Sequence, residues 1–322
     1  MLVPDRASLQ CAAEVVYRTL RPTPQFAWPL LAEALGAEVW VKHENHTPVG
    51  AFKLRGGLVY FDELKRREPA CRGVISATRG NHGQSVGFAA RAAAMPATIL
   101  VPHGNSLEKN AAMRALGVEL VEHGHDFQAA REEAARIATA RGLHAIPAFH
   151  PDLVRGVATY WTEMFDAVPD LDVVFVPIGQ GSGISACIAA REALGRTTRI
   201  VGVVSAQAPC YALSYRAGRV IEAPVATQLA DGLACRAPDA DALDVICRWV
   251  DDVIEVTDAE VAAAMRLLFA ATHNVAEGAG AASLAAAYRR RSAFAGRKVG
   301  IVVSGGNVDS DQFARVLAGA DH

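Results

Sequence analysis

The stretch DVVFVPIGQGSGI, from Asp172 to Ile184, joins an apolar run to a turn with three glycines in five positions. The apolar run predicts a β-strand buried on both faces, as in a parallel sheet covered by helices. The glycines let the backbone approach a ligand and offer several N–H groups at the start of the next helix, which predicts a cradle for a phosphate group. The turn lacks the GK[ST] ending of a Walker loop, which argues against a nucleoside triphosphate site. It also lacks the GxGxxG spacing, so a dinucleotide site is poorly supported.

The same strand–turn–helix pattern repeats along the chain. Predicted strands cover Glu38–Lys42, Gly73–Ala77, Ala97–Val101, Glu119–Glu122, Asp172–Val176, Arg199–Val204 and Lys298–Val303. Predicted helices include Ser106–Leu116, Phe127–Arg141, Asp258–Thr272 and Ala281–Arg291. This alternation indicates an α/β fold with mostly parallel sheets flanked by helices. The strands between about Gly73 and Ala145 would form one compact unit and the later strands a second sheet, with ligands beyond the carboxyl ends of the strands.

Composition and charge narrow the class of partner. The 322 residues carry a formal net charge of −2, and lysine and arginine are dispersed, which argues against nucleic acid or an anionic membrane as partner. The six cysteines are scattered without a CxxC pair, which favours reduced thiols. Asp5 and Arg6 stand where a signal peptide needs an apolar stretch, and Arg91 and Pro96 interrupt the most apolar long window. We therefore expect a cytoplasmic protein with a small-molecule partner.

A second motif, HENHTPVGAFKLRGG, runs from His43 to Gly57. Pro48 and Gly50 predict a turn, and Lys53 follows near the start of a helix. The helix dipole and burial both disfavour the charged ammonium there, which frees the amine for imine chemistry. A lone lysine is far more often a solvated surface residue, so this segment gains weight only together with the other motifs.

Two further segments follow predicted strands. SATRGNHGQS, from Ser76 to Ser85, offers hydroxyls and N–H groups to an anion such as a carboxylate, or else is a plain connection capped by Asn81. VVSGGNVD, from Val302 to Asp309, places a hydroxyl at a strand tip, with two glycines that leave room for a flat ligand; the alternative is a simple turn.

In this order and at these spacings, the four segments resemble the fold-type-II family of pyridoxal phosphate enzymes, and most closely its serine/threonine dehydratase branch. The run PVGAFKLRGG matches the lysine motif of that branch, usually written P-[ST]-G-S-F-K-x-R-G. The resemblance covers nearly the whole chain. It implies a two-lobed fold similar to the β subunit of tryptophan synthase, with a large cofactor-binding lobe (1–54 plus 148–322) and a small mobile lobe (55–147). Because the chain stops at His322, no C-terminal regulatory domain is expected.

The resemblance also implies roles for individual residues. Lys53 would be the catalytic residue and would bind pyridoxal 5'-phosphate covalently. The other residues implied at the cofactor are Phe52 beside the ring, Asn81 at its hydroxyl, Ser304 at its nitrogen, Glu277 nearby, and Gly179, Gln180, Gly181, Ser182 and Gly183 at the phosphate. The residues implied at the substrate are Ser76, Thr78, Arg79, Asn81 and His82. Candidate wall residues are Tyr160, Ala230, Asp231 and Cys235.

The activity implied by the resemblance is that of a dehydratase, or ammonia-lyase. Such an enzyme converts a β-hydroxy amino acid such as L-threonine or L-serine into a 2-oxo acid and ammonia by α,β-elimination. A bulkier substrate, such as phenylserine or a hydroxyectoine-derived amino acid, is the first alternative. A racemase, a β-replacement synthase and a non-catalytic pyridoxal-phosphate-binding protein are the others.

Departures from the family pattern separate some of these alternatives. Arg79 stands where racemases place an acid–base serine, and arginine is a poor base, which disfavours racemisation. The stretch Ser205–Tyr211 lacks the carboxylates with which some relatives bind a divalent cation, so we expect no metal site. The family also suggests a homodimer.

Overall fold

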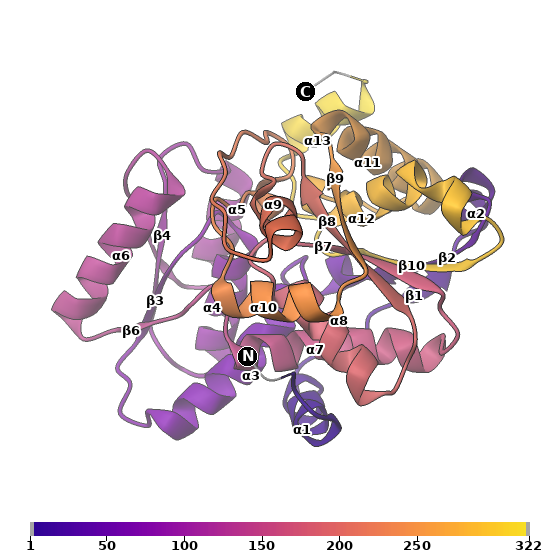
Figure 1. The fold of residues 1–322 in the computed structure, drawn as a ribbon. Helices are drawn as coiled ribbons and strands as arrows, with labels where there is room; N and C mark the ends of the chain where they lie inside the picture. Colours follow the sequence, from indigo (N-terminus) through magenta and orange to yellow (C-terminus); the bar gives the residue numbers. More distant parts are fainter. Residues whose placement is uncertain (1–2, 320–322) are drawn as a thin grey trace.

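Ten β-strands form two separate sheets in the computed structural model, which describes residues 3–319 (Figure 1). The larger sheet has the order β1 (Gln25–Ala27), β2 (Glu38–His43), β10 (Lys298–Val303), β7 (Val173–Pro177), β8 (Arg199–Ser205) and β9 (Asp252–Val256). The smaller sheet has the order β5 (Glu119–Glu122), β4 (Ala97–Val101), β3 (Val74–Ala77) and β6 (His144–Ala145). All neighbouring strands are parallel except β1 and β2.

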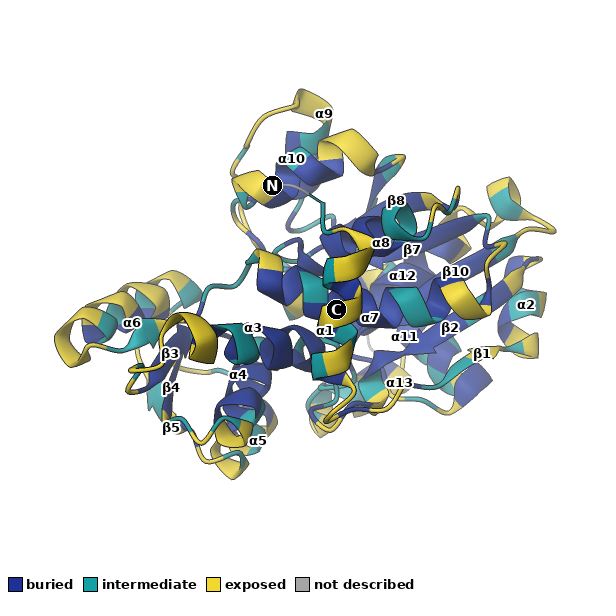
Figure 2. Cartoon of the chain, turned by 90° about the horizontal axis from the view of Figure 1, so that it is seen from below, coloured by how far each residue is buried: buried dark blue, intermediate teal, exposed yellow. Residues whose placement is uncertain are grey.

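Helices cover both faces of each sheet. On one face of the larger sheet lie α7 (Pro151–Ala167), α8 (Ser182–Ala193) and α10 (Ala240–Trp249), with α1 (Arg6–Val16) and α9 (Cys210–Ala217) beside them. On the other lie α2 (Pro29–Leu35), α11 (Asp258–Thr272), α12 (Gly278–Arg289) and α13 (Ser310–Leu317). The smaller sheet packs against α3 (Lys53–Arg67), α4 (Asn81–Ala92) and α5 (Leu107–Ala115) on one side and α6 (Phe127–Arg141) on the other. Figure 2 shows that buried residues concentrate in the larger sheet and its helices, whereas α6 is largely exposed.

The predicted α/β architecture is confirmed. All seven predicted strands form, each within one residue of its predicted bounds, because each is a short β-branched run bounded by turn residues. The strands β1, β6 and β9 were not predicted; the first two have three and two residues, too short for a periodic pattern. The helix predicted from Ala281 begins earlier, at Gly278, with Glu277 as its N-cap.

The strands of the smaller sheet all come from the part of the chain between Val74 and Ala145. The exact lobe bounds and the mobility of the small lobe stay predictions. The predicted large lobe also includes residues 1, 2 and 320–322, which lie outside the described residues. Within residues 3–319, no helix is long and apolar enough to cross a membrane.

A buried ion network fixes the start of α3. The guanidinium of Arg55 donates to both carboxylate oxygens of Glu44, at 2.8 and 2.9 Å, and to Glu163 of α7 at 2.6 Å. Lys42 of β2 donates to the other oxygen of Glu163. Arg55 and Glu44 are fully buried. The network therefore ties the first turn of α3, which begins at Lys53, to both β2 and α7.

Replacing Arg55 by methionine tests this network. The Arg55→Met variant should lower the free energy of unfolding by about 3–5 kcal/mol, because it leaves a buried carboxylate without its charge partner. Adding Glu44→Gln should recover part of the loss, since the uncompensated charge is then removed. Urea denaturation followed by circular dichroism measures both changes.

The matched control is Arg66→Met on the exposed side of the same helix, where the arginine side chain is 61% exposed and pairs only with other exposed or partly exposed groups. This variant should change the free energy of unfolding by less than about 1 kcal/mol. Equal losses for Arg55→Met and Arg66→Met would show that the buried network does not hold the helix.

Candidate active site

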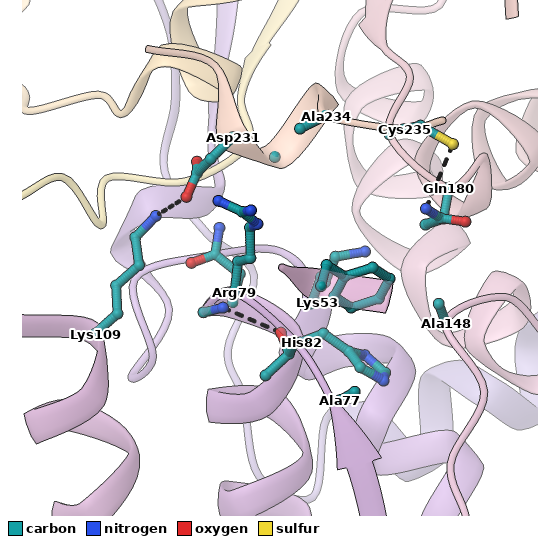
Figure 3. A pocket seen from close by; sticks show the side chains of 16 residues that line it. Lys53, Ala77, Arg79, His82, Lys109, Ala148, Gln180, Asp231, Ala234 and Cys235 are labelled. Atoms are coloured by element: carbon teal, nitrogen blue, oxygen red, sulfur yellow. Dashed lines mark hydrogen bonds and ion pairs between the residues drawn. The ribbon is translucent and has the colours of Figure 1, made fainter. Parts of the chain in front are cut away.

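A pocket lies where the carboxyl ends of strands from both sheets meet. Figure 3 shows side chains from several loops and helices converging on it. Its lining residues are Lys53, Ala77, Thr78, Arg79, Gly80, Asn81, His82, Lys109, Phe127, Ala148, Gly179, Gln180, Asp231, Gly232, Ala234 and Cys235. Two of the four sequence motifs contribute half of these residues, the loop after β3 and the glycine turn after β7. Lys53 brings in the third.

Lys53 presents an amine to this pocket from the first turn of α3. Its Nζ lies 5.0 Å from the centre of the Phe52 ring and has no hydrogen-bond partner among residues 3–319. Burial lowers the pKa of this amine to about 8, and the negative charge of Glu277 opposes that shift. A neutral amine is therefore accessible near neutral pH, as imine chemistry and general-base catalysis both require.

The glycine turn presents free hydrogen-bond donors. The backbone N–H groups from Gly179 to Gly183 meet no acceptor within the described part of the chain, and α8 has no side-chain N-cap. Gly181 has a φ of 95°, and a Cβ at Gly179 would lie 2.3 Å from the carbonyl oxygen of Gly232. Glycine is thus required at both positions. Free N–H groups at a helix N-terminus are suited to bind a phosphate.

Beside the pocket, the side-chain amide of Asn81 contacts Glu277 and Asn307. Asn81 donates to Glu277 at 2.6 Å and accepts from Asn307 at 2.8 Å, so its amide is held between the two. Burial raises the pKa of Glu277 to about 7, with Lys109 opposing the shift. Ser304 follows β10, and its carbonyl oxygen accepts from the backbone N–H of Phe52 at 3.0 Å. That bond holds the tip of β10 beside the lysine motif.

The loop after β3 and the first turn of α4 form a second set of free donors. Within residues 3–319, the N–H groups from Asn81 to Gly83 meet no acceptor, and α4 has no side-chain N-cap. Burial, and then the positive charge of Lys53, lower the pKa of His82 to about 3, so its ring stays neutral. The buried Nε2 of that ring has no partner in the described chain. Thr78 accepts from Gly80 N–H at 3.1 Å, which fixes the loop.

Not all of the predicted site residues line the pocket. Ser76 is inside β3, where its hydroxyl donates to the carbonyl oxygen of Ile146 at 3.2 Å. Of the candidate wall residues, Asp231 and Cys235 line the pocket, whereas Tyr160 is buried in α7 with its ring centre 6.1 Å from that of Phe52. Arg79 lines the pocket and is exposed.

Lys109 is a pocket residue that none of the four sequence motifs includes. It lies on α5 beside the smaller sheet, and its Nζ donates to Asp231 at 2.6 Å and lies 3.7 Å from Glu277. Burial alone would lower the pKa of Lys109, but the two carboxylates outweigh burial and raise it. Its position in the first turn of α5 was an available signal, because a cation is unfavourable at a helix N-terminus unless tertiary partners stabilise it.

Comparison with known proteins shows the family. The sequence profile of a family described as pyridoxal-phosphate dependent enzyme matches residues 16–305. This chain belongs to that family. As a pyridoxal-phosphate dependent enzyme, it falls in the serine/threonine dehydratase branch of fold type II, as its four motifs predict, and its cofactor is pyridoxal phosphate.

Relatives support the branch across most of the chain. L-Threonine ammonia-lyase of Thermotoga maritima is 34% identical over 289 residues, which are 89% of this chain and 72% of that protein. L-threo-3-Hydroxyaspartate ammonia-lyase of Saccharomyces cerevisiae is 30% identical over 322 residues, covering 100% of this chain and 98% of that protein. The structure of the processed form of threonine deaminase isoform 2 from Solanum lycopersicum matches with a TM-score of 0.90 at 28% identity, covering 99% of this chain and 95% of that one.

The residues of this pyridoxal-phosphate dependent enzyme fit its cofactor. An unpaired amine of lowered pKa, an aromatic ring beside it and a row of free N–H groups at a helix N-terminus match an aldehyde, a flat ring and a phosphate. Within residues 3–319, no group of three or more His, Cys, Asp or Glu side chains is placed to hold a metal ion. That activity needs no divalent metal stays a prediction.

The two lysines of the pocket give a direct test of the covalent link. Reduction of the holoenzyme with borohydride should leave the cofactor on the Lys53 peptide, because the pKa of Lys53 is lowered whereas that of Lys109 is raised. Peptide mass spectrometry locates the label. Lys53→Ala should lose it, and Lys109→Met, the matched control, should keep it on Lys53. Recovery of the label on any other lysine of the unmodified enzyme would contradict the assignment.

Proposed function

We propose that this enzyme is an ammonia-lyase that removes water from a β-hydroxy amino acid such as L-threonine or L-serine and yields a 2-oxo acid and ammonia. Lys53 carries the proposal: its unpaired amine, with a pKa of about 8, opens into the same pocket as the free N–H groups of α4. A base beside an anion receptor is the arrangement that proton abstraction next to a carboxylate needs. The threonine ammonia-lyase among the relatives gives independent support.

Each part of the pocket has a task in this reaction. Bound pyridoxal phosphate supplies an electron sink for the charge left at the substrate α-carbon. The N–H groups of Gly179–Gly183 hold the cofactor phosphate, and those at the start of α4 hold the substrate α-carboxylate. The Lys53 amine takes up the α-proton. His82 stays neutral and takes no part in proton transfer, because burial keeps its pKa far below the working pH.

Ser304 is proposed to face the nitrogen of the cofactor ring. It is buried at the tip of β10, next to the lysine motif, and its hydroxyl is neutral. A neutral partner does not hold a ring nitrogen protonated, which limits how much negative charge the ring stores and favours prompt loss of the β-hydroxyl.

The charge at position 304 is therefore expected to govern the product ratio. Ser304→Asp should slow oxo-acid formation by about tenfold or more and raise the share of racemised or transaminated product, because a carboxylate favours a protonated ring nitrogen. Ser304→Asn is the matched neutral control and should keep the parent's product ratio. Chromatography of the products measures both. If Ser304→Asp eliminates as fast as the parent with the same ratio, Ser304 does not face the ring.

We also propose the cytoplasm as the site of action and a homodimer as the working form. The scattered cysteines, all free thiols in the described structure, suit a reducing compartment. The dimer rests on the resemblance to the family.

A bulkier β-hydroxy amino acid is the second candidate substrate, and the yeast relative, named for L-threo-3-hydroxyaspartate, supports it.

Release of oxo acid and ammonia from hydroxy amino acids tests the proposed reaction. The holoenzyme should form both products in equal amounts from at least one of L-threonine, L-serine, L-threo-3-hydroxyaspartate and L-threo-phenylserine. Chiral chromatography of the remaining substrate should show little D-enantiomer, since Arg79 is a poor base. Rapid racemisation, or a β-replacement product without oxo acid, would refute the ammonia-lyase in favour of the alternatives.

A further inference from the structure

Arg79 is the pocket cation that makes no ion pair within 4.0 Å and no hydrogen bond in the described chain. Three cationic side chains line the pocket: Lys53, Arg79 and Lys109. Lys109 pairs with Asp231, the one carboxylate among the lining residues of the described chain. Lys53 is the residue proposed to bind the cofactor covalently, so its amine is not available to pair with an anion. The carboxylate linked to Arg79 by charge is Asp126, the N-cap of α6, whose pKa is lowered chiefly by its hydrogen bond to Ala129 N–H and also by the Arg79 charge.

The other anions expected in the pocket already have receptors. The cofactor phosphate has the N–H groups that begin α8, and the substrate α-carboxylate has those that begin α4. Both receptors are backbone groups on helix termini, and neither includes the Arg79 side chain. A free guanidinium in the same pocket therefore adds a third site for negative charge.

The position of Arg79 suits a substrate side chain. Its loop is held by the Thr78–Gly80 hydrogen bond and by Thr78 N–H donating to Leu100 at 3.0 Å. In the view of Figure 3 its guanidinium end is directed away from His82, toward the side of the pocket where Asp231 lies. It is exposed, so an arriving ligand meets it without having to displace a buried partner.

We propose that Arg79 binds a second carboxylate carried by the side chain of the substrate, so that the preferred substrate is a 3-hydroxy dicarboxylic amino acid. This rests on the proposed ammonia-lyase activity and narrows it. The planar guanidinium donates two parallel hydrogen bonds that match a carboxylate. Asp231 does not oppose this choice, because Lys109 neutralises it at 2.6 Å.

Kinetics with paired substrates test the assignment. The holoenzyme should use L-threo-3-hydroxyaspartate with a kcat/KM at least about tenfold above that for L-serine or L-threonine. Arg79→Ala should lower kcat/KM for the dicarboxylate by about 10- to 100-fold, the range for losing one charged hydrogen-bonding partner, chiefly by raising KM. The same variant should change kcat/KM for L-serine by less than about threefold. Arg72→Ala, a second exposed arginine near β3, is the matched control and should change neither.

A binding measurement separates this inference from the reaction itself. L-Aspartate, L-2-aminobutyrate and L-2,4-diaminobutyrate carry no β-hydroxyl, so their binding is followed by the change in cofactor absorption without elimination of water. L-Aspartate should bind tightest to the unmodified enzyme and lose that preference in Arg79→Ala. If no hydroxy amino acid yields oxo acid, the proposed reaction fails, but the preference for L-aspartate still decides the role of Arg79.

Three outcomes would overturn the inference. Tightest binding of L-2,4-diaminobutyrate would show that Asp231, not Arg79, sets the charge preference. Equal losses for L-serine and the dicarboxylate in Arg79→Ala would place Arg79 at the α-carboxylate. Unchanged kinetics and binding in that variant would show that the guanidinium only faces solvent.

Discussion

The position of the Lys53 amine depends on the guanidinium of Arg55, two residues further along α3. Arg55 spans Glu44 and Glu163 inside the protein, and these carboxylates belong to the segment after β2 and to α7. Buried ion pairs do not necessarily add stability, but they specify one arrangement, because any other leaves a charge uncompensated. Because the first turn of α3 is fixed in this way, the backbone position of Lys53 is fixed as well. The pocket is assembled around that point.

A second set of charges links the two sheets at the pocket. Lys109 lies on α5, which packs on the smaller sheet. Its partners lie beside the larger sheet: Glu277 is the N-cap of α12, and Asp231 follows Ala230, which packs in the same core as α12. Glu277 in turn holds Asn81 of α4. The relative position of the two sheets, the protonation of Glu277 and the orientation of Asn81 are thus coupled. A movement of the smaller sheet would change the electrostatic environment of the amine as well as the shape of the pocket.

Sequence alone predicted seven of the ten described strands and the four chemical motifs, because both depend on local patterns. A β-branched run followed by glycines marks the end of a strand in a parallel sheet, and Gly179–Gly183 and Ser304 lie there in the structure. Lys109 escaped prediction because its partner Asp231 is 122 residues away, and such pairings are set by tertiary packing rather than by spacing. Ser76 shows the opposite limit: its place in a motif gives no information about the direction of its side chain, which bonds to Ile146.

The crossing of α3 and α7 limits how this protein can be redesigned. A Cβ at Gly156 would lie 2.2 Å from the carbonyl oxygen of Arg55, and one at Gly56 would lie 2.8 Å from that of Leu153. Neither neighbour is a flexible side chain, so the two helices would have to separate and carry Lys53 with them. Libraries aimed at new substrates therefore have to leave positions 56 and 156 as glycine. Diversity is better placed at Phe127, Ala148 and Ala234, which line the pocket without carrying the lysine.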